Sequence, residues 1–556
     1  MNTRMPIGVD DFAKVRRDYY MVDKTDMIRR LIDNHAEVTL FTRPRRFGKT
    51  MAMSMLDYFF SIEKKEETIH LFDGMAIDKA GEQYMAERGR YPVIFMTLKG
   101  VQNDTMPLLF ESFQYLLQQQ FEKHAYLLDK GILHGQERRF YQSMLDRSGS
   151  MADCQVSLLE LCKYLHRFYG VPPIILLDEY DAPIQCAYDH GFYDKAISYF
   201  RTWYNNTLKG NPYLSFAVLT GVLRIAKESI FSGLNNLSVC TVLSHSYQDA
   251  FGFTSEEVDK LAGDLSMTPE ERETMKEWYD GYSFGGVDIY NPWSVISFAA
   301  GGFRPMPYWV NTSGNAILKK LLPRQDEARA KSLEGLLRGG TVKTTIREST
   351  IYENIGENRS ALYSMLLTTG YLTAASGPLS SYDRYALRIP NQEIREVYRS
   401  EILDHLAPQV DQDRFYTLFE ALLSGDAEEF KEELSCILLH VVSTFDGGGK
   451  EIFYHGFMLG MTALFLGKDY IVESNRESGY GRFDLAIFPK EAGKAGVLME
   501  FKAAEKEEDL PEKAEEALRQ IREKAYDAAF TARGVGKVWK YGIAFAGKRV
   551  EMKYEN

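Results

Sequence analysis

The chain has 556 residues, of which 45% are apolar and 26% charged, and its formal net charge is −12 at pH 7. This length exceeds what one hydrophobic core supports, so we expect about three or four globular domains. The negative charge argues against a protein that coats nucleic acid nonspecifically, because phosphate contacts dominate that kind of affinity, and any polyanion site must be a local patch.

Neither a membrane span nor a secretory signal is predicted. The longest apolar runs fall short of about 18 residues, and no basic segment followed by an apolar one opens the chain. We therefore expect a cytoplasmic protein with no membrane partner. The five cysteines are odd in number, widely spaced and without a C-x-x-C pair, which favours reduced core thiols over disulfides or structural zinc.

The segment FTRPRRFGKT, residues 41–50, ends like a phosphate-binding loop of the Walker A type. Val38–Thr42 predicts a short buried strand before the loop, and apolar residues at helical spacing follow it. Backbone N–H groups at the start of such a helix point at phosphates, and the helix dipole favours their charge. Gly48 would let the backbone approach, Lys49 would reach the β- and γ-phosphates of ATP, and Thr50 would hold Mg²⁺.

The loop departs from the G-x-x-x-x-G-K-[ST] pattern at Arg43, which stands where the first glycine belongs. Arg43 must either take a conformation that glycine usually supplies or give the loop another shape, and Pro44 restricts it further. A basic loop that enters an ordinary helix is the alternative interpretation. For a nucleotide site, the expected contacts from this segment are Arg46, Phe47, Gly48, Lys49, Thr50 and Met51.

A second motif, PPIILLDEYD at residues 172–181, supports the nucleotide site. Ile174–Leu177 predicts a strand buried on both faces of a parallel sheet, and two acids follow at its carboxyl end, where such sheets bind ligands. Asp178 is placed to bind Mg²⁺ directly or through water, and Glu179 to orient or deprotonate the attacking water. A solvated acidic turn is the alternative, but both motifs in this order favour an ATPase.

Apolar strands predicted at 91–98 and 213–220, with helical patterns at 105–125 and 153–168, indicate a doubly wound P-loop sheet.

Two polar residues at the end of the last of these strands are further candidates. Thr220 lies where related ATPases keep a residue that senses the γ-phosphate, and Arg224 could supply positive charge to the transition state in cis. A surface arginine at the start of a helix is an equal alternative for Arg224.

The middle of the chain is rich in aromatic residues, glycine and asparagine, in strings such as WYDGYSFGG. This composition favours a small irregular subdomain over a base-stacking platform. The charged helical pattern after Asn391 predicts a connector built from a helix pair joined at 424–426, and Asp446–Gly449 predicts a flexible stop.

A second candidate site lies near the C-terminus. Residues 481–503 predict a hairpin in which Asp484 begins the first strand and Glu500 and Lys502, two apart on the second, share a face. Two carboxylates beside a lysine make an oxygen-rich site for Mg²⁺, which would polarise a phosphodiester and hold a water that the lysine helps activate. This is the D…E-x-K layout of metal-dependent nucleases.

Flanking segments add to this interpretation. A helix at KEIFYHGFMLG places Glu451 and His455 on one face, where Glu451 could approach the metal as a third acid, although such a histidine is more often a packed residue. Residues 511–530 predict an amphipathic helix with Gln520 and Lys524 beside its apolar stripe, where they could contact a phosphate. D…E-x-K alone is common by chance, but this surrounding order favours a nuclease.

Together, FTRPRRFGKT, IILLDEYDAPI, TGVLRIAKESIFSGLNNL, WYDGYSFGG and SNRESGYGRFDL with LMEFK resemble the bacterial AAA-ATPase-like proteins that carry a C-terminal PD-(D/E)XK nuclease domain. The resemblance covers nearly the whole chain. It implies an α/β protein with an additional-strand, AAA-like P-loop domain, a helical middle region and a restriction-endonuclease-like C-terminal domain. It also implies that RPRRFGK is a family variant of the loop. Phe483 stands where the nuclease motif has a proline, a position that is widely dispensable.

By the same resemblance, the residues expected to carry ATP hydrolysis are Lys49, Thr50, Asp178 and Glu179, and those of the nuclease centre are Asp484, Glu500 and Lys502. We expect a P-loop ATPase domain at 1–235, an aromatic-rich helical lid at 236–390, a helical connector at 391–445 and a nuclease-like domain at 446–556.

The leading hypothesis is an ATP-dependent switch that regulates or powers a Mg²⁺-dependent nuclease acting on nucleic acid, DNA in the first instance, in defence or genome maintenance. A nucleotide-gated protein whose C-terminal fold binds but does not cleave is the alternative, and nucleotide binding without turnover is a third. A homo-oligomer is left open, because many P-loop ATPases complete their site with a neighbouring subunit's arginine.

Overall fold

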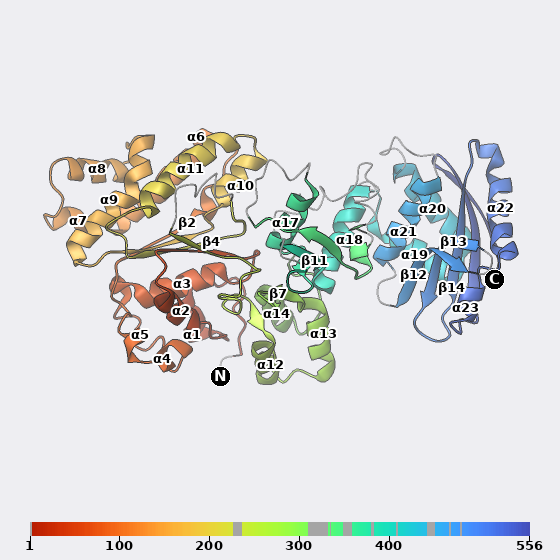
Figure 1. The fold of residues 1–556 in the computed structure, drawn as a ribbon, viewed down its shortest axis with the longest axis horizontal. Helices are drawn as coiled ribbons and strands as arrows, with labels where there is room; N and C mark the ends of the chain where they lie inside the picture. Colours follow the sequence, from red (N-terminus) through yellow and green to blue (C-terminus); the bar gives the residue numbers. More distant parts are fainter. Residues whose placement is uncertain are drawn as a thin grey trace. The chain divides into compact units, whose positions relative to one another are not determined.

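The computed structural model describes residues 3–225, 236–309, 332–333, 335–348, 358–379, 383–406, 410–441, 451–465, 469–478 and 481–555. The chain divides into two compact units (Figure 1). Unit 1 comprises Met1–Ser313 and Thr341–Arg395, and unit 2 comprises Gly314–Gly340 and Glu396–Asn556. Across the described residues, no helix combines the length and the apolar character needed to cross a membrane.

A five-stranded parallel sheet forms the centre of unit 1. Its order is β2-β3-β4-β1-β5, and every neighbouring pair is parallel. The strands are β1 (Val38–Thr42), β2 (Val93–Thr97), β3 (Ile174–Asp178), β4 (Phe216–Gly221) and β5 (Leu237–Cys240). Because β4 lies between β1 and β3, the sheet has the inserted strand that the additional-strand P-loop fold requires. The edge strand β5 was not anticipated from the sequence.

Helices cover both faces of this sheet, as the doubly wound prediction requires (Figure 1). On one side lie α1 (Phe12–Asp18), α2 (Asp26–Asn34), α3 (Lys49–Phe60), α4 (Ala76–Lys79) and α5 (Glu82–Met85). On the other lie α6 (Met106–Lys123), α7 (Tyr126–Asp129), α8 (Gln136–Leu145), α9 (Met151–Tyr169), α10 (Ala182–Asp189) and α11 (Tyr193–Leu208). Helix α3 packs on β2, β3 and β4, so the residues at its start face the carboxyl edge of the sheet.

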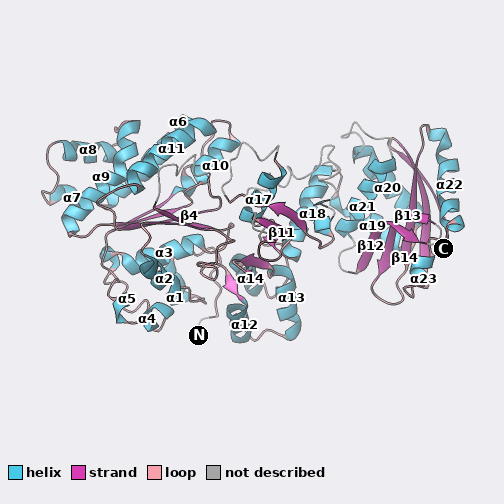
Figure 2. Cartoon of the chain, in the orientation of Figure 1, coloured by secondary structure: helices cyan, strands magenta, loops and turns pink. Residues whose placement is uncertain are grey.

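The rest of unit 1 combines helices with two small antiparallel sheets (Figure 2). One has the order β6-β8-β7 and the other β10-β11-β9. The strands are β6 (Phe253–Thr254), β7 (Tyr282–Phe284), β8 (Val287–Tyr290), β9 (Val342–Thr345), β10 (Thr373–Ala374) and β11 (Arg384–Arg388), and the helices are α12 (Ser255–Asp264), α13 (Pro269–Tyr279), α14 (Pro292–Ala300) and α17 (Arg359–Thr369).

The aromatic residues of this region pack a core, as the composition indicated. Tyr279, Tyr290 and Phe298 are buried in one apolar cluster. The two sheets were not predicted, because strands of two to five residues are too short to show an alternating pattern. Helix α18 (Gln392–Leu406) begins in unit 1 and ends in unit 2.

Unit 2 is built on a five-stranded mixed sheet whose strands follow in chain order. They are β12 (Tyr470–Ser478), β13 (Gly481–Pro489), β14 (Gly496–Ala503), β15 (Val538–Ala546) and β16 (Arg549–Glu555). The β14–β15 pair is parallel and the others are antiparallel. The predicted hairpin of β13 and β14 is therefore confirmed.

The helices of unit 2 are α19 (Gln412–Ser424), α20 (Ala427–Val441), α21 (Glu451–Phe465), α22 (Leu510–Glu523) and α23 (Ala528–Thr531). The predicted helix pair joined at 424–426 is confirmed, with Gly425 in the left-handed conformation (φ 87°) that ends α19. The predicted stop at 446–449 lies outside the described residues. Helix α22 approaches β15 so closely that a Cβ on Gly542 would lie 2.4 Å from the backbone of Ala514.

Candidate active sites

The loop between β1 and α3, residues 43–48, takes a shape that does not need glycine at its first position. Its left-handed residues are Arg46 (φ 68°) and Gly48 (φ 83°), and not Arg43. A Cβ on Gly48 would meet nothing within 4 Å, so the conformation and not space explains this glycine. Of the two possibilities for Arg43, the structure shows the second, in which the loop is shaped differently.

Arg43 is a buried structural residue. Its guanidinium donates hydrogen bonds to the backbone carbonyls of Thr42 (2.9 Å), Cys240 (2.8 Å) and Tyr247 (3.0 Å), and it lies over the rings of two phenylalanines. Burial lowers its pKa to about 10, so it stays charged at neutral pH. Arg43 thus links the 43–48 loop to β5 and to the segment that follows it.

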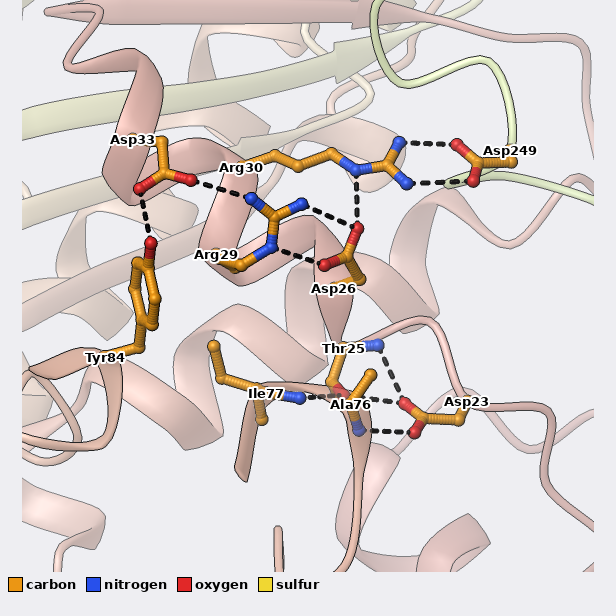
Figure 3. A network of polar contacts seen from close by, with 10 residues as sticks. All are labelled: Asp23, Thr25, Asp26, Arg29, Arg30, Asp33, Ala76, Ile77, Tyr84 and Asp249. Atoms are coloured by element: carbon orange, nitrogen blue, oxygen red, sulfur yellow. Dashed lines mark hydrogen bonds and ion pairs between the residues drawn. The ribbon is translucent and has the colours of Figure 1, made fainter. Parts of the chain in front are cut away.

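An ion-pair network anchors that segment (Figure 3). Arg30 on α2 donates to both carboxylate oxygens of Asp249, at 2.5 and 2.9 Å, and its Nε donates to Asp26 at 2.6 Å. The hydrogen bond that Arg30 donates to Asp249 is the main cause of the raised pKa of Arg30. Lys24 Nζ donates to the Asp249 carbonyl at 2.8 Å. The Tyr247 carbonyl, which accepts a hydrogen bond from Arg43, therefore lies two residues before Asp249, which this network holds in place.

Three of the predicted residues meet at the carboxyl edge of the sheet. Asp178, at the end of β3 and 1% exposed, accepts hydrogen bonds from Thr50 Oγ1 (2.7 Å) and from Thr220 Oγ1. Thr50 lies in the first turn of α3 and Thr220 near the end of β4. The parallel strands bring these three together, because their carboxyl ends share one edge.

Lys49 lies beside this cluster, at the start of α3. Its Nζ donates to the backbone carbonyls of Arg43 (3.1 Å) and Pro44 (3.0 Å), and burial lowers its pKa. The ammonium group is thus held inside the curve of the loop. Glu179, which follows β3, adopts a left-handed backbone (φ 53°), a conformation that costs a non-glycine residue about 1 kcal/mol or more.

Asp181 lies within the second motif, but the sequence indicated no role for it. It is 3% exposed and its Oδ2 accepts the backbone N–H groups of Val222 (2.9 Å) and Leu223 (2.8 Å). Burial raises its pKa to about 6, and the charge of Glu179 adds to this effect. A Cβ on Gly221 would lie 2.6 Å from Asp181 Oδ1, which explains the glycine at the end of β4. The signal in the sequence was a third acid in LLDEYD.

The other residues expected around the loop turn their side chains elsewhere. Arg46 donates to the Tyr308 carbonyl at 2.6 Å and lies 4.3 Å from the centre of the Trp293 ring. Phe47 is buried against the rings of β7, and Met51 packs against the core beneath the sheet. The side chains of Arg46 and Phe47 are thus engaged away from the loop, and their expected contacts with a nucleotide would have to come from their backbones.

Arg224 pairs with Glu348, Nη1 to Oε2 at 3.6 Å, and both side chains are partly exposed. Exposed pairs of this kind contribute little to stability, so the contact does not fix the arginine in place. Its role beside a nucleotide stays a prediction.

A chain of hydrogen bonds joins the 43–48 loop to helix α18. Trp309 donates its Nε1–H to the Arg45 carbonyl at 3.3 Å and its backbone N–H to Glu393 at 2.9 Å. Ser294 Oγ also donates to the Glu393 carboxylate. Glu393 lies in the first turn of α18, is fully buried, and has a pKa that burial raises to about 7. Its position could not be inferred from the sequence, because no motif surrounds it.

In unit 2, the structure brings Asp484, Glu500 and Lys502 together. Lys502 Nζ lies 3.5 Å from Glu500 Oε1, and the Asp484 backbone N–H points at Glu500 Oε2 at 3.4 Å. Asp484 Oδ2 in turn accepts the Phe501 N–H at 2.7 Å. The β13–β14 register sets this arrangement, since Leu485 pairs with Met499 and Asp484 and Glu500 are the adjacent residues on the two strands.

The carboxyl groups of Asp484 and Glu500 lie close together and are largely removed from water. Glu500 is 2% exposed, and burial together with the Asp484 charge raises its pKa to about 8. Burial also raises the pKa of Asp484. A divalent cation between the two acids would offset the repulsion between their negative charges. Water would fill its remaining ligand positions, an arrangement that suits Mg²⁺. Asp484 and Glu500 are the two acids of this site. Among the described residues, no cluster of three His, Cys, Asp or Glu side chains is arranged to hold a metal.

The flanking candidates contribute unequally. Gln520 on α22 donates to Glu500 Oε1, so it supports the acid directly. His455 Nε2 contacts the Asp484 carbonyl at 2.9 Å and the Ser474 hydroxyl at 3.2 Å, which is the packed role that is more common for such a histidine. Lys524 is exposed. Glu451 begins α21, but its side chain lies outside the described residues.

Comparison with known proteins agrees with this architecture. Residues 6–231 match the family model described as "Predicted AAA-ATPase", and residues 449–555 match the model described as "PD-(D/E)XK nuclease superfamily". The chain therefore has the domain architecture of proteins that combine an AAA-ATPase-like domain with a PD-(D/E)XK nuclease-superfamily domain. It is 26% identical over 552 residues to a protein of Azotobacter chroococcum mcd 1 named "Uncharacterized protein in vnfD 5'region", and the match covers 96% of this chain and 94% of that protein.

Proposed function

We propose that this protein binds and hydrolyses ATP at the 43–48 loop and that its C-terminal domain is a Mg²⁺-dependent nuclease that cleaves nucleic acid, DNA in the first instance, under the control of the ATPase. The domain limits that we propose are 1–235, 236–390, 391–445 and 446–556. The observation that carries the proposal is the meeting of Asp484, Glu500 and Lys502 on two neighbouring strands, with both acids desolvated.

For the ATPase half, each role follows from the contacts around Asp178. Lys49 would leave the loop carbonyls for the β- and γ-phosphates, and Thr50 with Asp178 would hold Mg²⁺, which supplies charge to the phosphates. Thr220 is close enough to Asp178 to report on this arrangement. Glu179 would orient the attacking water and accept its proton.

For the nuclease half, Asp484 and Glu500 would hold the metal, whose charge would polarise the scissile phosphate. Lys502 is 16% exposed in its side chain and lies beside Glu500, so it can reach both a phosphate oxygen and a water. Gln520 keeps Glu500 aimed at Asp484. Glu451 is proposed as a third metal ligand.

The test is cleavage of labelled single-stranded and duplex DNA and of RNA by the full chain with Mg²⁺, with and without ATP. Wild type should give products that EDTA abolishes, and Glu500→Gln should lower the cleavage rate by about 100-fold or more while the protein stays folded. An exposed glutamate, Glu505→Gln, is the matched control and should cleave like wild type. Products that persist in Glu500→Gln would remove the nuclease half.

One observation favours the alternative, a nucleotide-gated binding protein that does not cleave. Among the described residues, two acids rather than three face the candidate metal site, and Gln520 and Lys502 already contact one of them. That alternative predicts ATP-dependent association with nucleic acid and no products from wild type.

A further inference from the structure

A hollow of about 700 Å³ in unit 1 is lined by residues with polar side chains, none of which belongs to the 43–48 loop. The residues that line it are Lys343, Thr344, Thr345, Asn358, Arg359, Ser360 and Arg384. Three of the seven are cations and none is an acid. The chain has a net charge of −12, so the positive charge of this lining is opposite in sign to the charge of the protein as a whole.

The cations come from three different elements that the fold holds in register. Strand β9 pairs with β11 so that Thr345 lies opposite Arg384 and Lys343 opposite Ala386. Directly opposed residues share a face of a sheet, so Lys343 and Arg384 are on the same side. The alternate residues of β9, Val342, Thr344 and Ile346, are buried, which leaves Lys343 and Arg384 on the exposed side.

Helix α17 brings the third cation. Ser360 Oγ donates to the Thr345 carbonyl, and the Arg347 N–H donates to Ser364 Oγ at 2.9 Å, so the start of α17 is fastened to the end of β9. Asn358 caps the helix through the N–H groups of Ser360 and Ala361. These contacts place Arg359 at the rim of the hollow, beside Ser360.

A purely structural role does not account for this grouping. Lysine on an edge strand such as β9 discourages pairing with other sheets. That purpose does not require Arg384, which is on the central strand β11, or Arg359, which is on a helix. Among the described residues, the acids closest along the chain to the lining are Glu348, which pairs with Arg224, and Asp383, which does not line the hollow.

We propose that this hollow binds the phosphate backbone of a nucleic acid. The ligand class follows from the lining, since several arginine and lysine side chains with hydroxyl and amide groups are the usual donors to backbone phosphates and carry no base specificity. The proposal rests on the proposed function in one respect, that the chain acts on nucleic acid. It adds a contact surface in unit 1 to the cleavage site proposed in unit 2.

The experiment measures binding of a short fluorescent duplex by anisotropy in the full chain carrying Glu500→Gln, across about 50 to 200 mM salt. Lys343→Glu with Arg384→Glu should weaken binding at least tenfold and flatten the slope of log K against log salt by about 2, because each of the two cations neutralises one phosphate. Lys209→Glu with Lys260→Glu, two exposed lysines outside the hollow, makes the same change in net charge and should leave the slope nearly unchanged.

Equal effects of the two double variants, or an unchanged slope in both, would overturn the proposal. A second result would also overturn it. If inorganic phosphate stabilises wild type but not Lys343→Glu with Arg384→Glu, and duplex binding is the same in both, the hollow is a site for small anions. Thermal unfolding of each variant checks that it is folded. If binding depends on the hollow but wild type cleaves nothing, the nuclease proposal alone fails; if wild type cleaves and the hollow variant binds normally, this proposal alone fails.

Discussion

Glu393→Gln is the substitution whose effect follows most directly from the structure. Glu393 is fully buried, accepts hydrogen bonds from Ser294 Oγ and from the Trp309 N–H, and has a pKa raised by burial from 4.5 to about 7. At about 1.4 kcal/mol per pKa unit, the difference between the unfolded and folded values corresponds to about 3 kcal/mol.

The sign follows from which state loses its proton first. Below pH 4.5 the carboxyl is protonated in both states and contributes nothing. Between about 4.5 and 7 the unfolded chain ionises while the folded protein keeps the proton, so the free energy of unfolding falls as the pH rises. Above about 7 both forms are ionised, and the loss stays constant at about 3 kcal/mol.

Glutamine cannot ionise, so the free energy of unfolding of Glu393→Gln relative to wild type should rise by about 3 kcal/mol between pH 4.5 and 8. Urea unfolding followed by tryptophan fluorescence measures this, since four of the five tryptophans lie in unit 1. The exposed Glu66→Gln is the control and should show a difference that does not depend on pH. A pH-independent difference for Glu393→Gln would refute the reasoning.

Three further predictions concern the sites and their support. Glu179→Gln should leave ATP affinity within about twofold of wild type and slow hydrolysis by about 100-fold or more, as measured by phosphate release; full hydrolysis would show that another group activates the water. Arg43→Met should lower the free energy of unfolding by about 3 kcal/mol or more, because three backbone carbonyls lose their donor, and a decrease below about 1 kcal/mol in urea titrations would contradict its structural role. Gly542→Ala should lower the melting temperature of unit 2, since its Cβ would lie 2.4 Å from the Ala514 carbonyl and no flexible side chain can yield; an unchanged melting temperature would argue against the close packing of α22.

The sequence predicted the parts of the fold that local patterns specify. Strands β1 and β3 are buried throughout and mostly apolar, and each ends at a motif. The β13–β14 hairpin was predictable for a similar reason, because its short connection and the two-residue spacing of Glu500 and Lys502 fix which side chains can meet. In both cases the decisive information lies within a few residues.

Contacts between distant segments could not be predicted. In the sequence Arg43 is only a departure from a glycine pattern, yet its place in the structure depends on carbonyls at Cys240 and Tyr247, about two hundred residues further along the chain. Likewise Arg46 lies against Trp293, and the Arg45 carbonyl accepts a hydrogen bond from Trp309, although both tryptophans are far along the chain. No single window of sequence contains both partners of such a contact.

Most of the buried charged side chains lie in or near the two candidate sites. Charged side chains are rarely buried, because removing them from water costs free energy unless a partner or a ligand compensates. Those that are buried among the described residues are Arg43, Lys49, Asp57, Asp178, Asp181, Glu393 and Glu500. Asp57 has a partner, Lys64 at 2.5 Å. Arg43 and Lys49 belong to the 43–48 loop or contact it, and Asp178 and Asp181 lie at or just beyond the carboxyl end of β3. Glu393 is joined to the loop through Trp309, and Glu500 belongs to the D…E-x-K cluster. Motifs identified Lys49, Asp178 and Glu500 in advance, whereas Asp181 and Glu393 became visible only through their burial. The cost of holding these groups out of water is concentrated where a nucleotide or a metal ion could offset it, which is what a pair of phosphate-processing sites requires.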